Sequence, residues 1–206
     1  MIFATSNPHK LEEARAILGP LGVRVQSLDE LGCELEEPEE DGVTFEDNAR
    51  LKARYYAKHL GRACLAEDSG LEVDALGGAP GVHSARYSGV AGSRDVRDRA
   101  NNERLLRELA GVAASERTAR FVCTLALADP EGTILAEARG TYEGVIAEQG
   151  RGENGFGYDP LLYLPDRGQT SAELSPSEKH ARSHRGHALR QLARLLTPEL
   201  LGTSDR

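Results

Sequence analysis

The stretch MIFATSNPHKLEEARAILGP, residues 1–20, places a short apolar run directly before a capped helical pattern. We interpret residues 1–5 as a buried strand. Asn7 is a favourable N-cap residue, and Pro8 suits the first position of a helix. The apolar positions that then recur at helical spacing, before Gly19-Pro20 ends the pattern, are Leu11, Ala14, Ile17 and Leu18. A strand followed by such a helix predicts an α/β fold.

The rest of the chain repeats this alternation of strand and helix patterns. Strands are expected at 23–28 and 62–68 and, as a hairpin that turns at 129–132, within 119–146. Helices are expected at 44–60, at 94–110 and from a capping box at Ser175 onward. Because no Pro/Gly/Ser-rich spacer is visible, we expect one domain over residues 1–206, with two lobes and no identifiable linker.

Charge and composition exclude several classes of protein. The net charge is -8 and no basic stripe is visible, which argues against a general nucleic-acid binder. The three cysteines form no CxxC pair, and Cys64 and Cys123 read as small core residues. No apolar run approaches the roughly 20 residues that span a bilayer, and the N-terminus is too polar for a signal peptide. We therefore expect a cytoplasmic protein that binds neither nucleic acid nor membrane.

Residues 5–10, TSNPHK, are the first candidate ligand site. A helix N-terminus presents N–H groups and a partial positive charge to an anion. Lys10 adds a full charge in the first turn, where it opposes the helix dipole and has little structural use. The pattern predicts a phosphate cradle, with a capped helix and a solvent-facing lysine as the alternative. The cradle residues are Thr5, Ser6, Asn7, Pro8, His9 and Lys10.

Glu67 and Asp68 form a second candidate site at the end of the expected strand. Adjacent strand residues point to opposite faces, so one acid can face a ligand while the other supports it. Mg²⁺ prefers oxygen ligands and takes one or two carboxylates from a protein. Asp68 with an acid from EEPEED, residues 36–41, could form such a site. The alternative is a solvated acidic turn.

Two later stretches complete the set of candidates. Residues 177–192 gather most of the cations of the C-terminal third, as a candidate anion or base reader or as a basic helix face. The stretch GENGFGYDP, 152–160, carries Phe156 on glycine-rich backbone with Asp159 beside it. It predicts either a tight turn with buried rings or a base platform, where stacking is worth roughly 1–3 kcal/mol. Together the four groups make a coherent nucleoside triphosphate site.

Five ordered motifs resemble the inosine triphosphate pyrophosphatase family over nearly the whole chain. They are ATSNPHKLEEARAIL, GVTFEDNARLKA, EDSGLEVDALGGAPGVHSARYSG, GFGYDPLLY and SHRGHAL. The resemblance implies an enzyme that hydrolyses ITP, dITP and XTP to the monophosphate and pyrophosphate, with Mg²⁺ as cofactor and a homodimer as the assembly. It also implies an elongated, two-lobed α/β fold with a central curved mixed sheet, flanking helices and a substrate cleft between the lobes.

The resemblance also assigns roles to residues. Residues 5–10 would hold the triphosphate, and Asp68 would be the proton acceptor and a metal-associated acid. Glu40 is the second metal-associated acid, with Glu39 and Asp41 as alternatives. The further substrate contacts that it implies are Lys52, Ser69, Phe156, Gly157, Tyr158, Asp159, Lys179, His184 and Arg185. Within these, Phe156 becomes the expected stacking platform, Tyr158 is expected to pack inward, and His184-Arg185 would read the purine 6-position.

Two rival functions remain. A pyrophosphatase of the Maf type, acting on modified pyrimidine nucleotides, belongs to the same chemical class, but GFGYD and SHR argue against it. A nucleotide-binding regulator without catalysis would keep Phe156 and the phosphate cradle but would not need Asp68. Release of pyrophosphate with and without Mg²⁺ separates the two classes.

Overall fold

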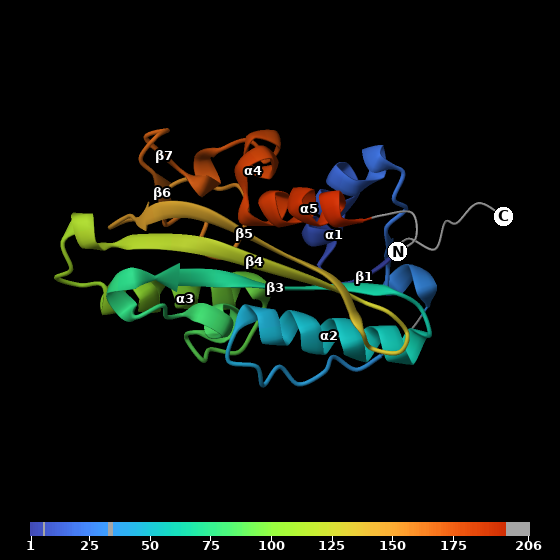
Figure 1. Ribbon diagram of the computed structural model, residues 1–206. Coiled ribbons are helices and arrows are strands. Elements are labelled where there is room, and N and C mark those ends of the chain that lie inside the picture. The colour runs from blue at the N-terminus through green and yellow to red at the C-terminus, as the bar shows by residue number, and fades with distance from the viewer. Residues whose placement is uncertain (6, 33–34, 197–206) are drawn as a thin grey trace. The chain divides into compact units, whose positions relative to one another are not determined.

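The structure is a computed structural model that describes residues 1–5, 7–32 and 35–196. Ser6 and Cys33 therefore lie outside the described residues. The strands are β1 (Ile2–Ala4), β2 (Gln26–Ser27), β3 (Cys64–Val73), β4 (Thr118–Ala128), β5 (Ile134–Ile146), β6 (Leu162–Leu164) and β7 (Gln169–Thr170). The α-helices are α1 (Pro8–Leu18), α2 (Phe45–Leu60), α3 (Arg94–Glu108), α4 (Pro176–Arg182) and α5 (His184–Leu195) (Figure 1).

The described strands form one mixed sheet in the order β2-β1-β3-β4-β5-β6-β7. β1 runs parallel to both β2 and β3, whereas β6 pairs antiparallel with β5 and β7. β4 and β5 are neighbours, and Asp129 donates its N–H to the carbonyl of Thr133 at their turn. The α/β class, the mixed sheet, the flanking helices and the hairpin are thus confirmed.

The expected caps account for where two helices begin. Asn7 caps α1, since its side chain accepts the N–H of His9 at 3.1 Å. Thr44 caps α2 by accepting the N–H of Asp47 at 3.1 Å. Among the described residues no helix has both the length and the apolar character needed to cross a bilayer.

The chain divides into two compact units. Unit 1 comprises Met1–Asp68, Cys123–Gly140 and the C-terminal segment from His184, and unit 2 comprises Ser69–Val122 and Thr141–Ser183. Neither unit is continuous in sequence, because β3, β4 and β5 each contribute residues to both. This division explains why no linker is visible in the sequence.

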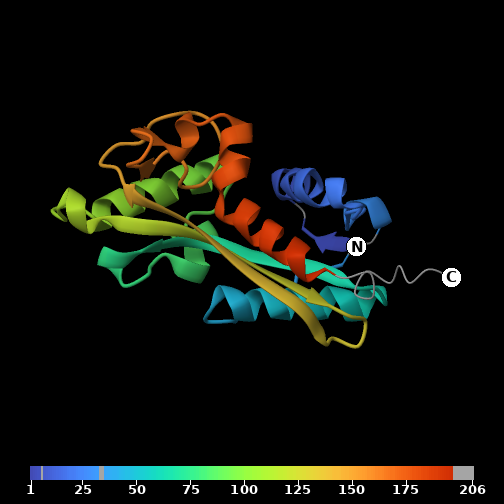
Figure 2. The same cartoon turned by 45° about the horizontal axis from the view of Figure 1, so that its top comes forward.

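Unit 1 buries both faces of its part of the sheet. Alternate strand residues point to opposite faces, so Phe3 and Leu65 pack with α1 and α5, whereas Ile2 and Cys64 pack with α2. Figure 2 shows α2 on one side of these strands and α1 and α5 on the other. Cys64 and Cys123 are buried core residues, as expected, and burial raises the pKa of both thiols. This two-sided core packs around the first half of β3. We expected the strand to end at Asp68, but it continues to Val73, so Glu67 and Asp68 lie in its middle.

Unit 2 has a core of its own. Leu105 of α3 and Leu109, which follows the helix, pack against Leu71 and Phe121 of the sheet. The segment between β5 and β6 adds Tyr158, whose ring is buried and whose hydroxyl donates to the carbonyl of Ser84 at 2.8 Å. The inward packing that we expected of Tyr158 is confirmed.

Candidate active site

The connection from β1 to α1 borders a cavity in unit 1. Thr5 Oγ1 accepts the N–H of Asn7 at 3.1 Å, which turns the chain into the helix. Thr5, Asn7 and Lys10 line a cavity of about 690 Å³, which is within the size range of small-molecule sites. Pro8 and His9 occupy the first turn of α1 and are exposed. Of the predicted cradle residues that the structure describes, Thr5, Asn7 and Lys10 therefore line the cavity, whereas Pro8 and His9 are not among its lining residues.

Lys10 is held by Glu67, an acid in the middle of β3. Its Nζ atom lies 3.0 Å from Oε1 of Glu67, and its side chain keeps one fifth of its surface exposed. Sequence reasoning did not identify this partner, although strand alternation predicted that one of Glu67 and Asp68 would support the site. The ammonium is thus positioned at the cavity wall, where Lys10 is a lining residue.

A buried network of charges stands behind Lys10. The guanidinium of Arg185 donates two hydrogen bonds to Glu67, at 2.8 and 2.9 Å, and one to Glu13 at 2.7 Å. All three side chains are almost fully buried. Burial by itself raises the pKa of Glu67, but Arg185 and Lys10 outweigh it and hold that pKa well below 4.5. Glu67 is therefore an ionised carboxylate that anchors both cations.

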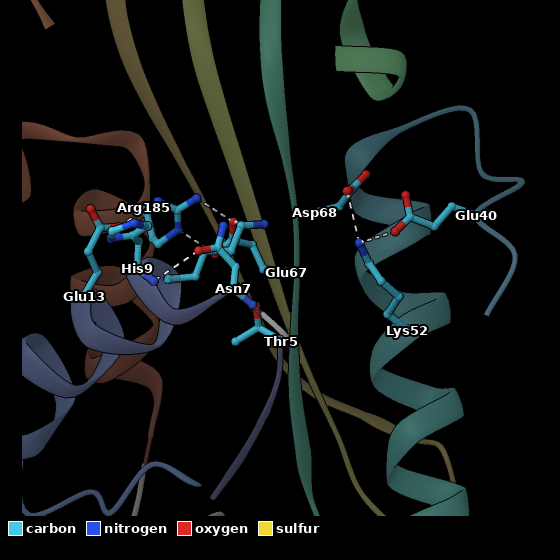
Figure 3. Close-up of polar contacts among 10 residues, drawn as sticks. Thr5, Asn7, His9, Glu13, Glu40, Lys52, Glu67, Asp68 and Arg185 are labelled. Atoms are coloured by element: carbon cyan, nitrogen blue, oxygen red, sulfur yellow. Dashed lines mark hydrogen bonds and ion pairs between the residues drawn. The ribbon is translucent and has the colours of Figure 1, made fainter. Parts of the chain in front are cut away.

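Asp68 points the opposite way from Glu67, as the alternation of a strand requires. Figure 3 shows Glu67 directed toward Arg185, and Asp68 directed toward Lys52 of α2. Asn48 donates its side-chain amide to Oδ2 of Asp68 at 3.1 Å, and Lys52 donates to Oδ1 at 3.1 Å. Asn48 and Lys52 are four residues apart, so they share one face of α2. Sequence analysis missed Asn48, although its helical spacing from Lys52 was a signal for it.

The second expected acid meets Lys52 from the other side. Oε1 of Glu40 accepts a hydrogen bond from Lys52 Nζ at 2.7 Å. Glu40 is half-buried and lines the cavity, whereas Glu39 and Asp41 are exposed. Among the three acids that the sequence left open, Glu40 is thus the one the structure brings to Lys52.

These residues fit a divalent cation of the hard, oxygen-preferring type. Glu40 and Asp68 both contact one cationic atom, Lys52 Nζ, so a positive charge already lies between two carboxylates. Within the described part of the chain, no three His, Cys, Asp or Glu side chains gather at metal-binding spacing. Mg²⁺ does not need such a cage, because it uses one or two carboxylates together with water and phosphate oxygens.

Burial tunes the charges around Asp68. Desolvation raises the pKa of Asp68, and it outweighs the opposing attraction of Lys52. Desolvation also acts to lower the pKa of Lys52, but the carboxylates of Asp68 and Glu40 outweigh it, and the net shift is upward. Asp68 is therefore a stronger base than an exposed aspartate, and Lys52 stays charged. A carboxylate whose pKa moves toward neutrality suits proton abstraction at physiological pH.

The residues expected at the base form a separate group in unit 2. The carboxylate of Asp159 accepts the N–H of Phe156 at 2.8 Å and the hydroxyl of Ser171 at 2.8 Å. It also forms an ion pair with Lys179, and both side chains are buried. Lys179 and Asp159 thus brace the turn that carries Phe156, and the direct substrate contacts predicted for them stay predictions.

The remaining predicted residues take ordinary positions in the fold. Ser69 continues β3 as the first residue of unit 2 and is half-buried. His184 is the first residue of α5 and is buried. Gly157 donates its N–H to Asp98 of α3 at 2.9 Å, a contact that sequence reasoning missed. The side chain of Arg185 is committed to Glu67 and Glu13, so its predicted role at the base edge remains untested.

Comparisons with known proteins agree with this architecture. The model of the Ham1 family matches residues 1–195. A dITP/XTP pyrophosphatase of Exiguobacterium sibiricum is 53% identical, with 96% of each chain covered. That of Bacillus subtilis is 49% identical over 95% of this chain and 96% of its own length. The solved structure of a HAM1 protein from Coxiella burnetii has a TM-score of 0.85 at 41% identity, covering 94% of this chain and 96% of that one.

Because the family model matches residues 1–195, the chain belongs to the Ham1 family.

Proposed function

We propose that the protein hydrolyses non-standard purine nucleoside triphosphates, namely ITP, dITP and XTP, to the monophosphate and pyrophosphate. It would thereby remove them from the nucleotide pool. The observation that carries this function is the Lys52 ammonium, which lies between Glu40 and Asp68. The names of relatives at 53% and 49% identity, dITP/XTP pyrophosphatase, support the substrate class.

The cavity of unit 1 supplies the binding site for the phosphates. Residues at the start of α1 offer N–H groups and hydroxyl or amide side chains to phosphate oxygens. Lys10 and Lys52, both on the cavity wall, neutralise negative charge there. We propose that the triphosphate lies beside these two lysines, because Glu36 and Glu37, which also line the cavity, would repel an anion.

Asp68 is the residue that we assign to proton transfer. Hydrogen bonds from Asn48 and Lys52 fix the orientation of its carboxylate, and its raised pKa makes it a better proton acceptor. A fixed base can hold the attacking water and accept its proton, which typically contributes 10²–10⁴-fold to a rate. We propose Mg²⁺ as the cofactor, held by Glu40 and Asp68; when bound, it would neutralise phosphate charge and increase the acidity of the water.

Selection of the base would divide between stacking and hydrogen bonding. Phe156 offers a π-face, which binds every purine in a similar way. The 6-carbonyl of hypoxanthine or xanthine accepts a hydrogen bond, whereas the 6-amino group of adenine donates one. Because the Arg185 guanidinium already donates to two carboxylates, we propose backbone N–H groups at the start of α5 as the donors that distinguish them. Binding of adenine would leave such a buried donor unpaired, and this cost can discriminate strongly against adenine nucleotides.

Release of pyrophosphate from ITP, XTP, GTP, ATP and dUTP, with and without Mg²⁺, tests this function. We expect metal-dependent release from ITP and XTP and little from ATP. Binding of ITP without release would favour the non-catalytic regulator, and preference for dUTP would favour a pyrimidine-directed enzyme. A homodimer and a cytoplasmic location are part of the same proposal, and sedimentation and cell fractionation test them.

A further inference from the structure

Helix α3 presents three residues, one turn apart, to the Phe156-Gly157 segment of unit 2. Asp98 accepts the N–H of Gly157 at 2.9 Å, and Asn102 donates its side-chain amide to the carbonyl of Gly157, also at 2.9 Å. One turn earlier, the guanidinium of Arg94 lies 4.3 Å from the centroid of the Phe156 ring. Spacing of four residues puts all three on one helix face. Helix α3 therefore hydrogen-bonds both backbone groups of Gly157 and places a cation over the ring of Phe156.

A second cation lies near the same ring, but in a different environment. Lys179 Nζ is 5.0 Å from the ring centroid, its side chain is 10% exposed, and it is bound to Asp159. The side chain of Arg94 is 41% exposed. Of the two cations near the ring, Lys179 is therefore the buried one and Arg94 the one that solvent reaches. A ligand that approaches this ring from solvent would thus meet Arg94.

We propose that Arg94 competes with the purine base for the face of Phe156 that its guanidinium covers. The guanidinium covers the ring in the ligand-free protein and gives way when a base stacks there. This proposal rests on the proposed function, in which Phe156 is the base platform. Asp98 provides a place for the displaced cation, because its Oδ2 atom lies 3.7 Å from Nε of Arg94. Arg94 would therefore give up the ring and keep the carboxylate that it already contacts on its own helix.

The exchange sets the size and the selectivity of the expected effect. The attraction between a guanidinium and an exposed ring must be overcome before a base can stack there. Removing the guanidinium should therefore tighten base binding about two- to five-fold. The guanidinium does not contact the groups at the purine 6-position in this scheme. Its removal should therefore strengthen binding of inosine and adenosine by similar factors.

The sharpest test measures the dissociation constant of inosine by equilibrium dialysis. Inosine carries no charge, so the loss of a positive residue does not by itself weaken its binding. We expect Arg94→Ala and Arg94→Gln to lower the dissociation constant about two- to five-fold. Arg97→Ala is the matched control, because Arg97 is an exposed arginine of the same helix. It should leave the constant unchanged.

A double-mutant cycle with Phe156→Ala shows whether Arg94 acts through the ring. In the Phe156→Ala background, Arg94→Ala should no longer tighten inosine binding. The proposal is overturned if Arg94→Ala weakens binding, because Arg94 would then clamp the base instead of competing with it. It is equally overturned if the gain persists without the ring, or if wild type binds no inosine. Dialysis requires no turnover, so a protein that bound inosine as expected but released no pyrophosphate would contradict only the proposed function.

Discussion

The Nζ atom of Lys52 lies 3.1 Å from Oδ1 of Asp68, so a cation from α2 holds the carboxylate that we propose as the general base. Asp68→Asn keeps the shape of the side chain and removes its basicity. We expect turnover of ITP to fall by about 10²–10⁴-fold, the usual contribution of a general base. The dissociation constant of ITP should change far less. Steady-state kinetics together with calorimetric binding would measure the two effects separately.

Near wild-type turnover of Asp68→Asn would remove this residue from the chemistry. Asp98→Asn is a useful comparison, since it alters a carboxylate that contacts Gly157 of unit 2 instead of Lys52. It should affect binding of the base more than turnover.

We expect Glu40 to set the Mg²⁺ concentration at which the enzyme reaches half of its maximal activity. Glu40→Gln removes one of the two carboxylates on Lys52, and we expect the Mg²⁺ concentration for half-maximal activity to rise at least ten-fold, within the 10–100-fold typical of weakened metal sites. Glu39→Gln and Asp41→Asn are matched controls, because both neighbouring acids are exposed. A larger shift in either control than in Glu40→Gln would reassign the metal-binding acid.

The Glu67–Arg185 pair predicts a defined dependence of stability on pH. Glu67→Gln leaves the Arg185 cation buried with less compensation, which typically costs about 3–5 kcal/mol. The folded-state pKa of Glu67 lies well below its ordinary value of 4.5, so its contribution is complete above pH 4.5 and declines as the pH falls toward the folded pKa. Urea unfolding should therefore show a large difference from wild type at pH 7, and a smaller one at pH 3.5. A difference that grew in acid would contradict this assignment.

Much of unit 1 follows from local sequence rules. The caps at Asn7 and Thr44 and the alternation of Glu67 and Asp68 depend on residues close in the chain, so spacing alone predicts them. Arg185 shows where such rules end. Its partner Glu67 is 118 residues away, and a basic stretch in the sequence does not reveal that one of its arginines is buried by distant acids.

The contacts of the Phe156 turn were equally hidden. Asp98 and Asn102 lie on a helix that reads as an ordinary charged surface, and their bonds to Gly157 span 59 and 55 residues. Composition identified the turn as unusual because of its glycines. It could not identify which helix the turn packs against, because that depends on tertiary folding.

Gly155 tests how tightly the Phe156 turn must be built. Its φ of +78° favours glycine, and a Cβ atom there would lie 2.1 Å from Oδ2 of Asp159 and 2.9 Å from Nζ of Lys179. Gly155→Ala should therefore displace the carboxylate that accepts the N–H of Phe156.

Gly157→Ala is the matched control, since its φ is also positive, at +61°, but a Cβ would meet nothing within 4 Å. Both variants carry the cost of roughly 1–2 kcal/mol for an L-residue at positive φ, and only Gly155→Ala adds the collision. We expect Gly155→Ala to lose more stability in urea and to raise KM for ITP and XTP by similar factors, because a misplaced ring weakens stacking for every base. Equal losses in the two variants would show that the Asp159–Phe156 contact does not position the ring.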